Sequence, residues 1–366
     1  MLQIPITGRL LILFAAAALV AAAPRAQILE HVGTVEFPNQ PFSEQEPDYR
    51  VGGSDVWGYT APDGTEYALM GVLDGLAIVQ VPSMEVVAHV PGPEDDDPYF
   101  HRDIKTFGHY AYVVAENLGT NEGLQVIDLS GLPESVELVS VHTEGVVSSH
   151  NLSVDAETGF LYVLDSDGDG VHVIDASDPR ALRNVSTIEV PDVHDVLAVG
   201  DRVYVAEGRS PTFSIWDLSD KEAPAMISRV TIPDAGYVHN IWPTDDGRYV
   251  LTTEETADKT VKVWDVSDPE NVTLVGEWLG ANRIAHNVHV RGRYAFLSHY
   301  AGGVIVVDIA DPANPVEVAR YDTTPEQDEA NFTGTWGTTL PSPAGYVYGS
   351  DLDGRLTVLR FHHPEG

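Results

Sequence analysis

Histidines recur at matching positions along the chain and could act together on a metal ion. His150, His194, His239 and His286 each precede an apolar segment at intervals of about 45 residues, and Arg102 takes the matching place one interval earlier. Neutral imidazole nitrogens are ligands for Zn, Cu and Fe ions. If the fold brings these four imidazoles to one point, they can bind such an ion, and we predict them as its ligands.

A second set of polar side chains ends the apolar segments that follow. Carboxylates beside imidazoles accept hydrogen bonds from them, orient them and raise their pKa values. Around the histidines we therefore predict a ligand-binding set that consists of Arg102, Glu116, Asp165, Glu207, Glu254, His299 and Asp351.

One acidic turn imitates a calcium loop. Asp165, Asp167 and Asp169 alternate before Gly170, as carboxylates do in the first half of a loop that wraps Ca²⁺. Ala176 stands where such a loop has its bidentate Glu. We therefore favour a plain acidic turn and keep a calcium site as the weaker alternative.

The elements that carry these residues repeat. Alternating apolar runs that close with Asp and a Ser-Asp-Pro-like turn occupy residues 123–130, 170–179, 213–220, 261–269 and 303–312. Their Asp residues are separated by 47, 42, 48 and 43 residues, the distances between Asp128, Asp175, Asp217, Asp265 and Asp308. An earlier series in each unit begins at Asp55, Asp103, Asn151, Asp195, Asn240, Asn287 and the Gly334-Thr335-Trp336 segment.

Each unit holds four short strands, which is typical of a propeller blade. We predict an all-β, seven-bladed propeller with blades that start near residues 54, 101, 149, 193, 238, 285 and 334. The last unit has three strands, so we expect residues 28–37 to supply the fourth strand and close the ring. Residues 27–366 then form one domain, which we expect to be monomeric.

This architecture places both polar series at one end of the ring, because the loop that enters the first strand and the loop between the second and third strands share an end. Three interpretations stay open there. The leading one is that the histidines satisfy buried polar groups, as in WD-type propellers, where Trp216 and Trp264 would sit on third strands. The others are a metal centre and acid-base catalysis without a metal.

The segments 54–59 (SDVWGY), 102–105 (RDIK), 149–152 (SHNL) and 331–336 (NFTGTW), with the repeated Val-Ile-Asp strands, resemble the LVIVD-repeat proteins of the choice-of-anchor B family. The resemblance covers nearly the whole mature chain. It implies an exported bacterial β-propeller and no particular activity. This chain departs from the family by ending without a recognisable anchor, so the sequence does not indicate surface attachment.

Composition excludes several functions. The formal net charge is −36, which disfavours nucleic acids and anionic membrane surfaces as partners. Cysteine is absent, so disulfides, Cys-bound metals and thiol nucleophiles are excluded. Only four of the 20 basic residues are Lys. Together with the excess of acidic residues, this scarcity indicates a saline habitat. The alternative is an ordinary acidic exported protein.

The N-terminal 26 residues are typical of a signal peptide. A positive Arg9 precedes an apolar run from Leu10 to Ala22, and small residues up to Ala26 allow cleavage. We expect a periplasmic, secreted or cell-surface protein with no membrane span in the mature chain. An uncleaved membrane anchor is the alternative.

For function, the leading hypothesis is a binding or interaction scaffold that uses one propeller face, with a protein, a glycan or a small molecule as its partner. The alternative is a metal-dependent hydrolase or oxidoreductase with the histidines at its centre. The sequence nominates no catalytic residue.

Overall fold

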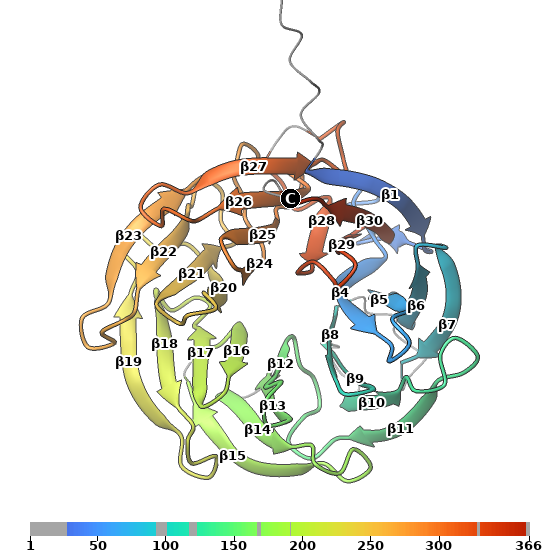
Figure 1. The fold of residues 1–366 in the computed structure, drawn as a ribbon, viewed down its shortest axis with the longest axis horizontal. Helices are drawn as coiled ribbons and strands as arrows, with labels where there is room; N and C mark the ends of the chain where they lie inside the picture. The colour runs from blue at the N-terminus through green and yellow to red at the C-terminus, as the bar shows by residue number, and fades with distance from the viewer. Residues whose placement is uncertain are drawn as a thin grey trace, which may run out of the picture.

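Seven four-stranded antiparallel sheets correspond one to one with the seven repeats. The computed structural model describes residues 28–92, 101–116, 123–166, 170–190, 192–327 and 330–363. The sheets stand radially around an axis, and each runs from an innermost to an outermost strand (Figure 1). The predicted seven-bladed propeller is confirmed.

The first strand of every blade lines the axis (Figure 1). These innermost strands are β4 (Gly53–Thr60), β8 (Arg102–Phe107), β12 (Leu152–Val154), β16 (Asp195–Val199), β20 (Val238–Pro243), β24 (Val288–Arg291) and β28 (Thr335–Thr338). The second strands are β5 (Glu66–Val72), β9 (Tyr110–Ala115), β13 (Phe160–Asp165), β17 (Arg202–Ala206), β21 (Tyr249–Glu254), β25 (Tyr294–Ser298) and β29 (Tyr346–Asp351).

The third and fourth strands complete each blade outward. The third strands are β6 (Gly75–Val81), β10 (Leu124–Asp128), β14 (Gly170–Asp175), β18 (Thr212–Asp217), β22 (Val261–Asp265), β26 (Val304–Asp308) and β30 (Arg355–Phe361). The outermost are β7 (Glu85–Pro91), β11 (Glu137–His142), β15 (Arg183–Glu189), β19 (Ala225–Thr231), β23 (Thr273–Trp278), β27 (Val316–Tyr321) and β1 (Leu29–Glu36). A separate hairpin joins β2 (Gln40–Pro41) to β3 (Arg50–Val51).

The N-terminal strand closes the ring. β1 pairs antiparallel with β30, from Leu29 opposite Phe361 to Glu36 opposite Arg355. Leu29 is buried against Tyr294 and Phe296 of the neighbouring blade. The first strand along the chain is therefore the outermost strand of the last blade, as the strand count predicted.

The repeated Asp residues end the third strands by a local rule. Oδ1 of Asp175 accepts a hydrogen bond from the amide of Ser177 at 2.9 Å, and Asp217 does the same for Ser219 at 2.8 Å. Such a bond to the amide two residues on stabilises a turn. The Asp therefore stops the strand and starts the hairpin to the outermost strand.

The earlier Asp and Asn series joins neighbouring blades. Oδ2 of Asp103 accepts a hydrogen bond from the amide of Leu152 in the next blade at 2.7 Å, and Oδ1 of Asn240 accepts from Val288 at 3.0 Å. A buried amide without such a partner would cost about 1–3 kcal/mol. Asp103 and Asn240 thus satisfy the start of the innermost strand of the following blade.

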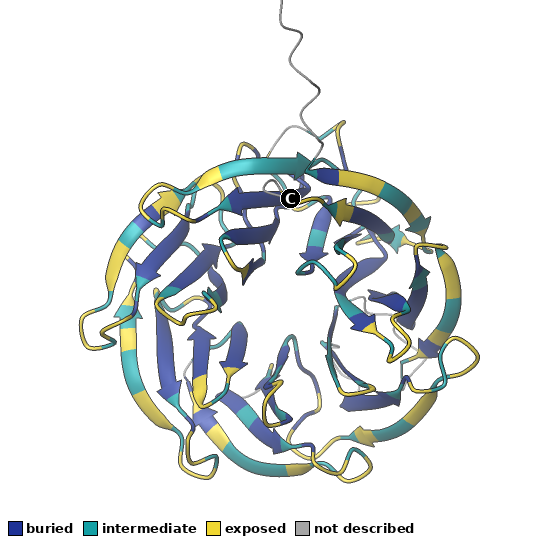
Figure 2. Cartoon of the chain, in the orientation of Figure 1, coloured by how far each residue is buried: buried dark blue, intermediate teal, exposed yellow. Residues whose placement is uncertain are grey.

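Apolar side chains fill the spaces between blades. Tyr59 and Leu69 of one blade pack with Ile104 and Ala111 of the next. Figure 2 shows the three inner strands of most blades buried, while the outermost strands are largely half-buried or exposed. Within the described residues, no helix is long and apolar enough to span a membrane.

Candidate functional site

Six aromatic side chains meet in a closed ring at one end of the axis. Neighbouring ring centroids are 5.4, 4.6, 4.0, 4.2, 4.3 and 4.7 Å apart in order around the circle. We call this set the axial ring, and it consists of His101, His150, His194, His239, His286 and Trp336. The four predicted histidines therefore do come together, joined by two residues that were not predicted.

Irregular strand starts place these side chains. The pairing of β20 with β21 shifts between Val238 and Ile241, and that of β28 with β29 shifts between Thr335 and Gly337. His239 and Trp336 lie inside these bulges. A bulge adds one residue to a strand and redirects its side chains, so a bulky ring can turn toward the axis while the strand continues.

Backbone carbonyls hold two of the imidazoles. Nδ1 of His194 donates to the carbonyl oxygen of His239 at 2.8 Å, and Nδ1 of His286 donates to that of Trp336 at 2.5 Å. A carbonyl oxygen only accepts, so the proton is on Nδ1. In the neutral ring, Nε2 therefore carries a lone pair that is free to bind a cation.

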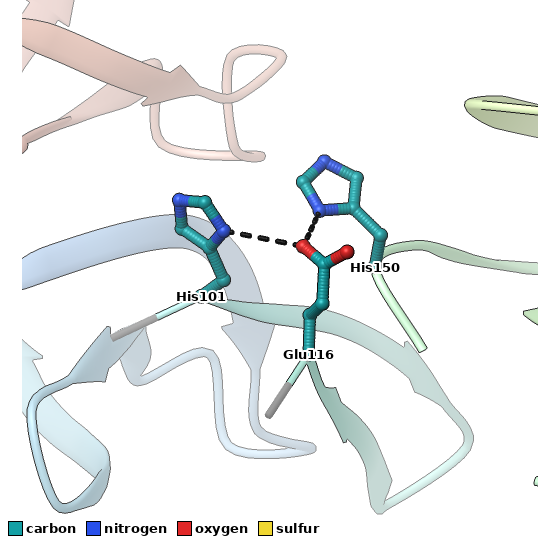
Figure 3. Close-up of side chains that lie close together, drawn as sticks. All are labelled: His101, Glu116 and His150. Atoms are coloured by element: carbon teal, nitrogen blue, oxygen red, sulfur yellow. Dashed lines mark hydrogen bonds and ion pairs between the residues drawn. The ribbon is translucent and has the colours of Figure 1, made fainter. Parts of the chain in front are cut away.

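Glu116 binds the other pair of imidazoles. Its Oε2 is 3.3 Å from Nδ1 of His101 and 2.7 Å from Nδ1 of His150. The second nitrogen of each imidazole lies on the side away from the carboxylate (Figure 3). Burial opposes the charged form of His150, but the hydrogen bond and the charge of Glu116 raise its pKa overall. The same two histidines hold the pKa of Glu116 far below its ordinary value, against the effect of burial.

Glu255 faces the opposite part of the axial ring. Its Oε2 is 3.9 Å from Nε2 of His239, and its Oε1 is 3.9 Å from Nε2 of His286. The hydroxyl of Tyr300 donates to Oε1. Burial and the neighbouring imidazoles lower the pKa of His239 well below its ordinary value. Burial likewise lowers the pKa of His286, so both imidazoles are neutral at pH 7.

A hollow opens beside the axial ring. It has a volume of about 300 Å³, and the ring side chains His150 and His194 form part of its wall. The rest of its polar lining comes from Glu116, Asp165, Ser166, Asp192, Arg209 and Tyr237. Together the axial ring and this hollow form what we call the axial mouth.

The channel below the axial ring holds buried carboxylates. A cavity of about 30 Å³ lies there between the ring and the side chains of Asp55, Arg102, Asp103, Asn151 and Asn287. Lys105 Nζ donates to Asp103 at 2.5 Å and lies 3.4 Å from Asp55, so it neutralises part of this charge. Burial raises the pKa of Asp195, in the same layer of the channel, to about 7.

Two of the seven predicted ligand-binding residues, Glu116 and Asp165, line the axial mouth. Of the predicted calcium set, Asp165 lies 3.6 Å from His172, while Asp167 and Asp169 lie outside the described residues.

The other five predicted residues are buried in contacts within and between blades. Arg102 donates to the carbonyl oxygens of Val72 and Leu73 at 2.8 and 3.1 Å. Glu207 accepts hydrogen bonds from Thr212 at 2.5 Å and from Arg229 at 3.0 Å, and Glu254 accepts one from Lys262. Asp351 accepts hydrogen bonds from Thr323 and Thr335 at 2.9 and 3.0 Å. The ring of His299 packs against Trp278.

The two third-strand tryptophans bond inside their own blades. Nε1 of Trp216 donates to the hydroxyl of Ser214 at 2.8 Å, and Nε1 of Trp264 donates to Thr252 at 2.9 Å. The hydrogen bonds that the axial imidazoles make to His239 and Trp336 instead cross from one blade to the next. These bonds occupy Nδ1 and leave Nε2 unused.

Four residues of the site were not predicted from the sequence: His101, Glu255, Tyr300 and Trp336. His101 directly precedes Arg102, and Glu255 directly follows Glu254, so each lies one residue from a predicted position. Tyr300 has a positive φ of 44°, a conformation that is uncommon for a bulky residue and that nothing in the sequence marks.

Comparisons with known proteins agree with this architecture. Residues 101–143 and 282–323 match the LVIVD repeat. No curated protein gives a significant match.

Solved structures share the fold at low identity. The structure of U3-55K has 10% identity and a TM-score of 0.64, with 89% of this chain and 98% of that chain covered. The RRP9 WD40 repeats have 10% identity and a TM-score of 0.65, with 91% and 100% covered. The Neurospora crassa Pan2 WD40 domain has 15% identity and a TM-score of 0.64, with 92% and 96% covered. The chain is thus a seven-bladed β-propeller with LVIVD repeats, and it fits an LVIVD-repeat propeller family.

Proposed function

We propose that this protein is an exported binding propeller that takes a small polar molecule with a cationic amino group at its axial mouth. The observation that carries the proposal is the hollow of about 300 Å³ beside the axial ring. Pockets for small molecules begin at about this volume. The N-terminal segment that is typical of a signal peptide supports export.

The charges around the hollow indicate the kind of molecule. Asp165, Asp192 and Glu116 supply carboxylates, while Arg209 supplies one guanidinium group. An ammonium group would pair with the carboxylates, and a carboxylate on the same molecule would pair with Arg209. The excess of negative charge over the whole chain would also concentrate cations near this surface.

Thermal unfolding tests the proposal. The purified chain without its leader would be heated with glycine, L-lysine, L-glutamate, putrescine or glucose, after removal of metal ions with EDTA. We expect lysine or putrescine to raise Tm, because binding to the folded state alone stabilises it. The double variant Asp165→Asn with Arg209→Gln should lose this rise.

Glu222→Gln is the matched control, since it removes an exposed acid from a turn of the same blade as Arg209. It should keep the rise in Tm. The proposal is overturned if neither lysine nor putrescine raises Tm, if glucose raises Tm as much as they do, or if the shift persists in the double variant.

A further inference from the structure

We propose that His239, Glu255 and His286 form a binding site for one divalent transition-metal ion, with Nε2 of each imidazole and the carboxylate as ligands. The metal site is part of the axial mouth, so this inference rests on the proposed function, which places ligand binding at that mouth. The inference adds a metal ion to the mouth and holds for any organic molecule that binds there.

The distances between the three side chains fit a shared ion. Both imidazole Nε2 atoms lie 3.9 Å from a Glu255 oxygen. A direct hydrogen bond between nitrogen and oxygen would need about 2.7–3.2 Å. Two atoms that are each bonded to one ion at about 2.0–2.2 Å lie at most about 4.4 Å apart. The spacing is therefore too long for a hydrogen bond and short enough for common coordination.

The donor atom of His286 is buried and unused. His286 is 1% exposed, and its Nε2 has no hydrogen-bond partner within the part of the chain that the structure describes. A buried polar atom without a partner costs about 1–3 kcal/mol. Coordination of an ion by Nε2 would remove this cost and would explain why the atom faces a carboxylate that it does not reach.

The surroundings hold two of the three ligands in place. The bond from Nδ1 of His286 to the carbonyl oxygen of Trp336 sets the tautomer that leaves Nε2 as a donor. The Tyr300 hydroxyl, from a residue that is itself 1% exposed, holds the carboxylate of Glu255. Groups that bond to the far side of metal ligands in this way orient them and raise metal affinity.

A similar group on the other part of the axial ring is already satisfied. Glu116 lies 2.7 Å from Nδ1 of His150 and 3.3 Å from Nδ1 of His101, and both contacts are hydrogen bonds. An ion between these atoms would have to break both bonds and displace the protons. Of the two His and Glu groups, the one with Glu255 is therefore the better metal site.

The donor set indicates which ions bind. Two imidazoles with one carboxylate suit Fe²⁺ and Zn²⁺, whereas Ca²⁺ and Mg²⁺ prefer oxygen ligands. Three protein ligands leave at least one coordination position for water or for another molecule. The ion would thus be open to a molecule in the axial mouth.

Cobalt binding tests the site without any assay of activity. The chain without leader or affinity tag would be stripped with EDTA, dialysed and titrated with CoCl₂, with visible absorption and calorimetry as readouts. We expect one Co²⁺ per chain. His286→Ala should weaken binding at least about 100-fold, and Glu255→Gln at least about tenfold, because each removes a ligand.

A control variant and a test of folding complete the experiment. His89→Ala removes an exposed histidine that pairs with Asp74 at 2.9 Å on another blade, and it should leave Co²⁺ binding unchanged. Circular dichroism would confirm that each variant is folded, and if His286→Ala does not fold, Glu255→Gln decides, since Glu255 is partly exposed.

The site is overturned if the wild-type chain binds no Co²⁺ below about 100 μM, or if Glu255→Gln binds it as tightly as the wild type. Loss of binding in Glu116→Gln with full binding in Glu255→Gln would also overturn it. A shift of Tm by lysine or putrescine in the EDTA-treated chain would survive such a failure, so the proposed function is judged separately.

Discussion

One buried histidine of an innermost strand should contribute measurably to the acid stability of this propeller. His289 on β24 is 5% exposed, and its ring centroid lies 4.4 Å from that of Trp242 and 6.0 Å from that of Trp57. Burial, helped by the charge of Lys105 and opposed by Asp103, lowers its pKa to about 3. The unfolded chain takes up this proton near pH 6.5. Stability that is fully present above that pH is therefore lost as the pH falls toward 3.

The size of this loss follows from the two pKa values. At about pH 4.5, an unfolded pKa of about 6.5 and the folded pKa of about 3 give a loss of about 3 kcal/mol relative to pH 8. Unfolding entropy is roughly 2.1 cal/mol/K per residue, so for the ~340 residues after the leader this loss lowers Tm by about 4 °C.

The variant His289→Phe isolates this contribution. Phenylalanine keeps an aromatic ring between the two tryptophans and does not titrate. Every other group titrates alike in both proteins, so the difference between their Tm values reports His289 alone. In calorimetry with EDTA, we expect the wild type to fall about 4 °C further than the variant between about pH 8 and pH 4.5. Parallel Tm curves for the two proteins would refute the reasoning.

Three further outcomes are expected. Glu116→Gln should lower the unfolding free energy by about 1–3 kcal/mol, because two imidazoles lose a charged acceptor; urea unfolding measures it. Leu29→Ala should lower the unfolding free energy by about 2–5 kcal/mol, because Leu29 is buried where the ring closes. Val316 is 57% exposed on the adjacent outermost strand, so Val316→Ala should change the same free energy by less than about 0.5 kcal/mol. In a bacterial host with the native leader, mass spectrometry of the exported protein should find cleavage between Ala22 and Ala26, and an intact leader on all of that protein would contradict cleavage and favour the uncleaved anchor.

The fold could be predicted because its repeating features are local. Asp175 bonds to the amide two residues on, so each such Asp marks the end of a third strand in the sequence itself. Asp103 bonds to the amide of Leu152 in the next blade, and Asn240 bonds to that of Val288 in the same way, so an Asp or Asn recurs at these strand starts. Once the strands are counted, a last unit with three strands needs a partner, and the segment that begins at Leu29 supplies it.

The site was predicted less well because residues at matching sequence positions of different blades do not always point the same way at the start of the innermost strand. Arg102 occupies the position of the other axial histidines, but its amide donates to the hydroxyl of Ser54 at 3.0 Å, and its guanidinium reaches the carbonyl oxygen of Val72. The side chain thus turns to the preceding blade, and His101 takes its place in the axial ring. A difference of one residue at a strand start cannot be seen in a repeat pattern.

The choice between Glu254 and Glu255 follows from the alternation of side chains along a strand. Thr252 binds Trp264, and Glu254 binds Lys262, so these two residues share the face that contacts the third strand of their own blade. Thr253 donates to the carbonyl oxygen of His286 in the next blade at 2.5 Å, and Glu255, two residues on, faces the imidazole of the same histidine. The side chain that bonds to Trp264 therefore identifies the face of β21 that is used within the blade. Glu254 lies on that face, whereas Glu255 lies on the opposite face and is the carboxylate available to the histidines.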